Sequence, residues 1–219
     1  MDIFLDRLRA SAFGETTRRG DVDLQGWVTS GFDECLDTVA SHLSRASRDV
    51  VFVEVGTWKG ASAVRIADAL KQRGVLKWLV CVDTWLGSPE CYTWGFDDPT
   101  LGRGLRAIAG FPTVFQTFAN NITSLGHEDV IAPFPISSIQ AAAALAHYKC
   151  KAHAVFVDSS REYDAVLADL HAYRPLLHDG GVMWGGGWDW PGVRVALEEF
   201  ARSQGLDAHI VHTNWMLFV

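Results

Sequence analysis

The spacing of hydrophobic residues divides the chain into buried strands and amphipathic helices. Residues 50–56 read VVFVEVG, and residues 78–83 read WLVCVD. Continuous apolar runs rich in β-branched residues are typical of strands buried on both faces of a parallel sheet. Between them, residues 61–72 follow the helical period and stop near Gly74. The pattern predicts a strand–helix–strand unit with parallel strands.

The same alternation continues to the C-terminus. The last two apolar runs, HIVHT and WMLFV, are separated by very few residues and predict an antiparallel hairpin. Alternating strands and helices indicate an α/β fold. We expect a Rossmann-like three-layer αβα sandwich with a mostly parallel seven-stranded sheet and a C-terminal antiparallel hairpin. The other expected elements are strands at 113–118, 130–134, 153–158 and 182–184, and helices at 119–126, 138–148, 162–177 and from Pro191 onward.

The N-terminal part has the hydrophobic spacing of helices. Apolar residues at helical intervals occur near Phe4 and again between Phe32 and Leu43. We expect one domain over 1–219, with a helical cap over 1–48 and a Rossmann-like core over 49–219. A long segment at 84–111 interrupts the core, and segments of this length are usually lids or binding loops.

Composition narrows the classes of partner. The chain has 219 residues, 48% of them hydrophobic, and a formal charge of −7, which gives no basic footprint for nucleic acid. No apolar run is long enough to span a bilayer, and the first residues lack the apolar centre of a signal peptide. Four widely spaced cysteines fit reduced thiols. We therefore expect a cytoplasmic protein without nucleic-acid or membrane partners. The N-terminal helices could also mediate a homodimer.

The run VEVGTWKGAS at 53–62 is the most informative motif. Gly56 and Gly60 allow backbone amides to approach a ligand where a strand turns into a helix. The spacing differs from the GxGxxG of nicotinamide enzymes, and Glu54 suits an ammonium group better than a phosphate. Asp83, ending the next strand, can accept both hydroxyls of a ribose. Together they indicate S-adenosylmethionine; the alternative is a turn whose glycines serve packing and whose Glu54 is solvated.

With VDTWLGSPE and FVDSSREYDAVLADLHAYRPLLHDGGVMWGGGWDWPGV, this run resembles class I S-adenosylmethionine-dependent methyltransferases, especially the macrocin-type and sugar O-methyltransferase branch. The resemblance covers about residues 50–205. It implies methyl transfer to a hydroxyl, in particular that of a sugar or glycan, with S-adenosylhomocysteine as product. The implied cofactor residues are Glu54, Gly56, Thr57, Gly60 and Ser62 around the methionine part, Asp83 at the ribose, Trp85 by the adenine or the lid, Ser137 and Ser138 near the adenine, and Asp158.

The chain departs from this family at two places. Relatives read Asp-x-x-His-x-Tyr where this chain has Asp158, Arg161 and Tyr163, and the histidine is their proposed base. Relatives also carry two acids, joining the aspartate in holding a divalent metal, where this chain has Gly186 and Gly187. Magnesium needs carboxylates and water, and arginine stays protonated. The metal-assisted histidine mechanism therefore does not carry over.

Several accounts of the chemistry remain open. In one, no metal is used, Asp158 is the base, and Arg161 replaces the metal's positive charge; Asp189 and then His212 are weaker base candidates. In another, the chain is a catalytically weakened protein that keeps only cofactor binding. Arg161 could instead pair at the surface with a neighbouring acid, and Asp189 could cap the helix that opens at Pro191.

Aromatic residues gather in the two regions placed at strand ends. Trp94, Tyr163, Trp188 and Trp190 could line a pocket for the methyl acceptor, or they could fill core and surface. No histidines have metal-ligand spacing together with acids, so we expect no tightly bound transition metal.

Overall fold

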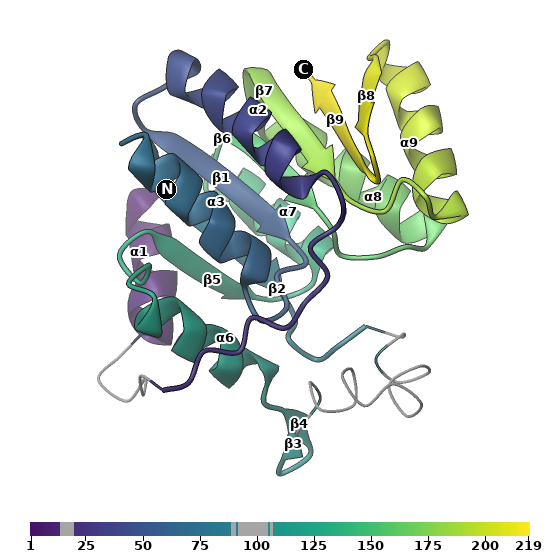
Figure 1. Ribbon diagram of the computed structural model, residues 1–219. Coiled ribbons are helices and arrows are strands. Elements are labelled where there is room, and N and C mark those ends of the chain that lie inside the picture. Colours follow the sequence, from purple (N-terminus) through teal and green to yellow (C-terminus); the bar gives the residue numbers. More distant parts are fainter. Residues whose placement is uncertain (14–19, 89–90, 92–104, 106) are drawn as a thin grey trace.

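A seven-stranded sheet forms the centre of the computed structural model, which describes residues 1–13, 20–88, 91, 105 and 107–219. Five strands are parallel, β9 runs antiparallel to β7, and β8 runs antiparallel to β9 (Figure 1). The prediction of a mostly parallel sheet with a C-terminal antiparallel hairpin is confirmed. In spatial order the strands are β5 (Ile131–Pro135), β2 (Leu76–Asp83), β1 (Val50–Val55), β6 (Ala152–Val157), β7 (Leu177–Gly185), β9 (Asn214–Phe218) and β8 (Ala208–Val211).

Helices cover both faces of the sheet. Because successive side chains of a strand point to opposite faces, Val51 and Val53 of β1 join one hydrophobic core and Val50 and Phe52 join the other. The first core is covered by α1 (Asp2–Ala12), α7 (Ser138–His147), α8 (Tyr163–Tyr173) and α9 (Pro191–Gln204). The second is covered by α2 (Phe32–Ala46), α3 (Ala61–Gln72) and α6 (Val114–Ser124).

Short elements complete the described part of the chain. A 3-10 turn, η1 (Arg174–Leu176), follows α8 directly. The two-residue strands β3 (Ala107–Ile108) and β4 (Phe111–Pro112) form a small antiparallel hairpin within the long segment at 84–111. No helix in the described ranges combines the length and apolar composition needed to cross a membrane.

The expected strand at 113–118 is wrong, because these residues begin α6. Val114, Phe118 and Ile122 are fully buried and lie four residues apart, which places them on one side of a helix. The β-branched and aromatic composition of TVFQTF favoured a strand. Burial of this stripe against the second core outweighs that preference.

The N-terminal 48 residues are not helical throughout. Residues 20–31 contain no helix and cross the carboxyl ends of the parallel strands (Figure 1); we call them the strap. Upstream of the strap, α1 buries Leu5 in the first core, and downstream α2 buries Phe32 in the second. We propose that the chain forms one domain, since segments on both sides of the strap join the cores of one sheet.

Candidate functional site

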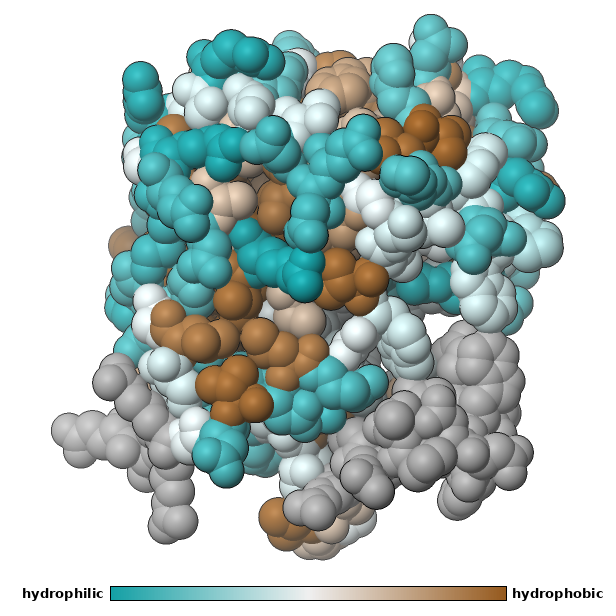
Figure 2. Space-filling model, viewed as in Figure 1, coloured by the Kyte–Doolittle hydropathy of each residue, from teal (hydrophilic) through white to brown (hydrophobic). Residues whose placement is uncertain are grey.

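A cavity of about 680 Å³ lies at the carboxyl ends of the parallel strands. This volume is within the usual range for small-molecule sites. The ends of β1 and β2, the loops after β5, β6 and β7, and the strap all contribute to its wall. On the face seen in Figure 2, hydrophobic residues gather in the lower half, where the strap passes in Figure 1. The site therefore lies where open α/β sheets bind ligands.

The turn after β1 has the predicted strand–turn–helix geometry; we call residues 56–60 the glycine turn. Gly56 has φ 89°, and a Cβ there would lie 2.6 Å from the carbonyl oxygen of Asp158. Only glycine fits, because the ends of β1 and β6 approach each other at this point. Gly60, with φ 88°, is the N-cap of α3 and does not line the cavity, whereas Gly56 and Thr57 do.

Asp83 lies in the cavity wall at the end of β2, but its carboxylate is already bound to backbone. Its Oδ2 accepts hydrogen bonds from the N–H groups of Thr57 (2.9 Å) and Trp58 (2.8 Å), and its Oδ1 accepts one from that of Trp85 (2.7 Å). A carboxylate has about four acceptor sites, so one remains for a ligand. Asp83 therefore both fixes the glycine turn and faces the ligand space.

The side chain of Trp85 lies in the second core and not at the cavity, where the place by the adenine was expected. It is buried and packs against Phe115 and Phe118, and its indole N–H donates to the carbonyl of Trp58 at 2.7 Å. It is not among the residues that line the cavity. The apolar surface of α6 draws the ring into the second core and leaves only its backbone at the site.

Glu54 is fully buried behind the cavity wall, so the solvated alternative is wrong. The hydroxyl of Ser62, which lines the cavity, donates to Glu54 Oε1, and the thiol of Cys81 lies 3.7 Å from Oε2. Burial raises the pKa of Glu54 to about 8 despite the hydrogen bond from Ser62. Glu54 is therefore largely protonated at neutral pH, and Ser62 stands between it and the ligand space.

Asp158 and Arg161, which follow β6, form an ion pair in the cavity wall. Arg161 Nη1 lies 2.8 Å from Asp158 Oδ1, and the two side chains are only 15% (Asp158) and 18% (Arg161) exposed. Burial raises the pKa of Asp158, and the charge and hydrogen bonding of Arg161 oppose the rise. The alternative of a surface pair between Arg161 and a neighbouring acid is wrong.

Gly186 and Gly187 open the space that this pair occupies. A Cβ on Gly187, which has φ 77°, would lie 3.1 Å from Arg161 Nε, and one on Gly186 would lie 3.4 Å from Asp158 Oδ1 and 3.1 Å from Thr29 Oγ1. Side chains at both positions would therefore point at the Asp158–Arg161 pair. Among the described residues, no three His, Cys, Asp or Glu side chains converge as metal ligands do.

The predicted acceptor residues are only partly brought together. Trp190 and Asp189 line the cavity, but Trp188 packs against the first core and does not. Tyr163 donates from its hydroxyl to Glu199 of α9 at 2.6 Å, outside the cavity, because its position at the start of α8 faces the neighbouring helix. Trp94 lies outside the described residues.

Two further alternatives are settled by position. The N-cap of α9 is Trp190 and not Asp189, so the interpretation of Asp189 as the cap of this helix is wrong. His212 is exposed, pairs with Glu34 at 3.8 Å, and does not line the cavity. It is therefore not placed to act as a base. Ser137 and Ser138, at the start of α7, do line the cavity.

Sequence reasoning missed several contributors to the wall, among them part of the strap and one acid of α8. Gly26–Ser30 of the strap line the cavity, although nothing in their pattern marks them. Asp169, buried in α8, also lines it; it accepts a hydrogen bond from Ser159 Oγ, and its Oδ1 has no partner among the described residues. A lone acid within the apolar run VLADL was the available signal for Asp169.

Comparison with known proteins gives one family and a set of structures with the same fold. Residues 53–185 match the profile of a family described as a methyltransferase domain. No curated protein sequence matches the chain significantly.

Three solved structures illustrate the fold. An O-methyltransferase from Bacillus cereus in complex with SAH has a TM-score of 0.56 and 13% identity, over 100% of this chain and 92% of that one. A TDP-rhamnose 3′-O-methyltransferase of calicheamicin biosynthesis has a TM-score of 0.52 and 16% identity, over 84% and 77%. A precorrin 8W decarboxylase from Methanobacterium thermoautotrophicum has a TM-score of 0.58 and 13% identity, over 88% and 90%. At these identities the likeness is one of fold.

Proposed function

This chain belongs to the family of methyltransferase domains, and we propose that it methylates a hydroxyl oxygen of a sugar or glycan. The family makes it an S-adenosylmethionine-dependent methyltransferase, with S-adenosylhomocysteine as product. The oxygen acceptor, the sugar and the residue roles are our proposal. The Asp158–Arg161 ion pair in the cavity wall is the observation that carries it.

The residues present fit the cofactor. Thr57 Oγ1 is buried at the cavity wall without a hydrogen-bond partner among the described residues, and such groups are normally satisfied. Asp83 keeps an acceptor site, and the glycine turn brings backbone close to the ligand space. We propose that Gly56, Thr57 and Ser62 hold the amino-acid part, with Glu54 acting through Ser62. Asp83 would hold the ribose, and Ser137 and Ser138 would lie at the adenine.

A divalent metal does not fit the residues present. Asp158 is the single carboxylate at the positions where relatives place three acids, and the guanidinium of Arg161 lies 2.8 Å from its Oδ1. A divalent cation bound to that oxygen would be repelled by the arginine at close range. We propose that Arg161 supplies the positive charge instead.

The chemistry then depends on two side chains. When bound, S-adenosylmethionine supplies a methyl group on a positively charged sulfur. An oxygen nucleophile can bond to this methyl carbon, and the sulfur then leaves as the neutral thioether of S-adenosylhomocysteine. Asp158 accepts the proton of the acceptor hydroxyl, and burial makes its carboxylate a stronger base than a solvated aspartate. Arg161 donates only from Nη1 among the described contacts, so its other N–H groups can hold the acceptor oxygen in place.

The aromatic residues at the cavity support a sugar as the acceptor. Trp27 of the strap is 53% exposed and Trp190 is 39% exposed, and both line the cavity. The apolar C–H faces of sugar rings pack well on indole rings of this kind. A sugar methyltransferase with the same fold is compatible with this proposal.

A labelled-methyl assay against a panel of acceptors tests the proposal. The panel contains TDP-rhamnose, free glycans and small phenols, with methyl-labelled S-adenosylmethionine as donor. We expect label on a sugar hydroxyl, and we expect Asp189→Asn to retain most of this activity while Asp158→Asn does not. Transfer to phenols alone would refute the sugar acceptor. Binding of S-adenosylhomocysteine without transfer to any acceptor would favour a weakened, cofactor-binding protein, which the missing histidine and acids would also explain.

A further inference from the structure

The strap reaches from the glycine turn to the acceptor side of the cavity. Asp23 and Gln25 contact the glycine turn, and Gly26–Ser30 line the cavity. At the far end, Thr29 is the side chain that a Cβ on Gly186 would meet, beside Asp158. One short segment therefore touches both the proposed cofactor site and the proposed acceptor site.

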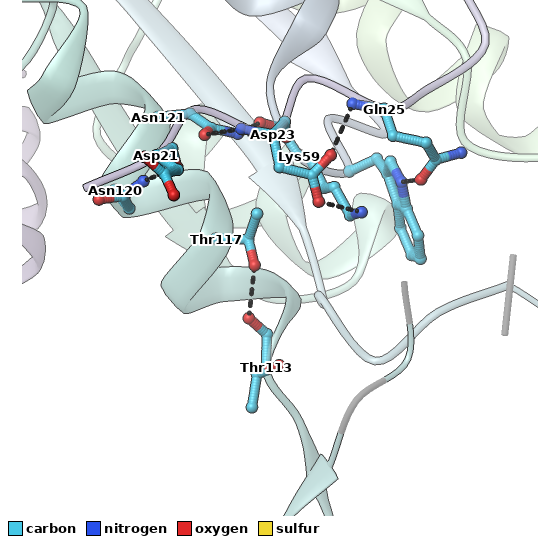
Figure 3. Close-up of polar contacts among 9 residues, drawn as sticks. Asp21, Asp23, Gln25, Lys59, Thr113, Thr117, Asn120 and Asn121 are labelled. Carbon is cyan, nitrogen blue, oxygen red and sulfur yellow. Dashed lines mark hydrogen bonds and ion pairs between the residues drawn. The ribbon is translucent and has the colours of Figure 1, made fainter. Parts of the chain in front are cut away.

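A buried lysine connects the strap to the glycine turn. Lys59 is only 4% exposed, and its Nζ lies 2.7 Å from Oδ2 of Asp23 in the strap (Figure 3). Lysine is almost never fully buried without a partner. The side chain of Asp23 is 52% exposed, so the ion pair joins a buried ammonium to a carboxylate in contact with solvent. The backbone of Lys59 belongs to the turn, while its ammonium belongs to the strap contact.

Asn121 of α6 forms hydrogen bonds to both the strap and the glycine turn. It is fully buried; its Oδ1 accepts from the N–H of Asp23 (2.9 Å), and its Nδ2 donates to the carbonyls of Asp23 (2.7 Å) and Lys59 (2.8 Å). The indole N–H of Trp58 in the turn donates a further hydrogen bond to Gln25 Oε1 in the strap (3.3 Å). Strap and turn are therefore fastened to each other at three side chains.

The acceptor end of the strap is fixed separately. Asn214 of β9 is fully buried; its Nδ2 donates to the carbonyl of Ser30 at 2.7 Å, and its Oδ1 accepts from Thr29 Oγ1 at 3.2 Å. The strap is thus held at both ends, with Trp27 between them at the cavity.

We propose that Lys59 is a positioning residue that couples the two sites: through Asp23 it fastens the strap to the glycine turn, so that the cofactor-binding turn and the acceptor wall form together. The proposal rests on the cofactor site proposed above. Because coupling between two sites is reciprocal, binding of the cofactor should stabilise the strap, and loss of the fastening should weaken cofactor binding. Cofactor binding should therefore also stabilise the wall of the cavity that Gly26–Ser30 form.

Titration of S-adenosylhomocysteine into the full chain, combined with hydrogen exchange of the strap amides, tests this coupling. Lys59→Met removes the charge while filling the same space, and Asp23 is exposed enough to be solvated without it. We expect Lys59→Met to bind S-adenosylhomocysteine at least about fivefold more weakly, the lower end of typical coupling. The ligand should slow strap exchange in the wild type, but not in this variant.

Two further variants keep the result unambiguous. Asp23→Ala breaks the same link from the surface side, and the double variant should bind no more weakly than Lys59→Met alone. Asn120→Ala is the matched control, because Asn120 donates to the strap carbonyl of Asp21 (2.8 Å) without touching the glycine turn (Figure 3). Its affinity should stay within twofold of the wild type.

Failure of the coupling and failure of the proposed cofactor site give different results. Wild-type affinity in Lys59→Met, or strap exchange that ignores the ligand, overturns the coupling while leaving the proposed function intact. Absence of binding to the wild-type chain would instead remove the proposed cofactor site itself.

Discussion

Replacement of Arg161 by methionine should cost stability in a pH-dependent way. The change leaves Asp158, whose side chain is 15% exposed, without the positive charge now 2.8 Å from its Oδ1. An opposite charge at this range lowers a carboxyl pKa by about one to three units, and each unit corresponds to about 1.4 kcal/mol. We therefore expect the pKa of Asp158, already raised by burial, to rise further in Arg161→Met.

The sign of the pH dependence follows from proton binding. When the folded state holds a proton more tightly than the unfolded chain, stability falls as the pH rises from the unfolded pKa to the folded pKa. The loss in Arg161→Met should thus be small near pH 4 and should reach about 1.4 to 4 kcal/mol once the pH exceeds the new pKa of Asp158.

Urea unfolding at pH 4.5 and at pH 7.5 measures both values. Arg65→Met is the control, because Arg65 pairs with Asp33 at 2.8 Å with side chains 46% and 75% exposed, and such pairs contribute less than about 1 kcal/mol. If Arg161→Met cost no more than the control, or cost the same at both pH values, the reasoning about a buried, coupled pair would be refuted.

Three further predictions concern two residues at the carboxyl end of β1 and one histidine at the amino end of β6. Gly56→Ala should unfold at a clearly lower temperature than Gly74→Ala, because its Cβ would lie 2.6 Å from a backbone oxygen whereas that of Gly74 meets nothing within 4 Å; equal melting temperatures would contradict this. The wild type should lose stability as the pH rises from about 4.5 to 8, because its folded state holds a proton on Glu54 with a raised pKa. Glu54→Gln has no such proton, so its stability relative to the wild type should rise over this range and stay constant above it. Urea titrations in which the two proteins have parallel pH curves would disprove this. The Nδ1 of His153 accepts a hydrogen bond from the N–H of Val51 at 3.1 Å, and burial and the nearby His178 lower the pKa of His153. The stability of the protein should therefore fall as the pH drops below about 6.5. His178→Gln should reduce that fall and should raise the pKa of His153 measured by NMR titration.

The parts of the fold that depend on short-range patterns were predictable. The run 50–56 and the glycines at 56 and 60 specify a buried strand, a turn and a helix start, because the residue types themselves demand these conformations. The carboxyl edge of the sheet then follows from topology, and it brought Asp83, Asp158 and Arg161 into one cavity wall.

Other features depend on contacts between distant segments. TVFQTF has the composition of a strand, but it becomes a helix because Val114 and Phe118 meet the second core. The strap has no periodic pattern; its course is set by Asn121 and Asn214, which lie far away in sequence. Trp85 shows the same limit, since its ring follows the apolar surface of α6 rather than the ligand space.

Burial also decided what individual acids can do. Glu54 was placed correctly at the end of β1, but its side chain lies behind Ser62, and the consequent rise in its pKa is invisible in a sequence. Tyr163 matched the family motif by spacing, yet it points to Glu199 because α9 packs against α8.

The central claim is that Asp158, paired with Arg161, removes the acceptor proton without help from a divalent metal. Its most direct test is the rate of labelled-methyl transfer to the best sugar acceptor in EDTA and in Mg²⁺, for the wild type and for Asp158→Asn. We predict equal wild-type rates in both solutions and a loss of about 10²- to 10⁴-fold in Asp158→Asn, the usual contribution of a general base. Wild-type activity that disappears in EDTA and returns with Mg²⁺, or an Asp158→Asn variant as active as the wild type, would contradict the claim.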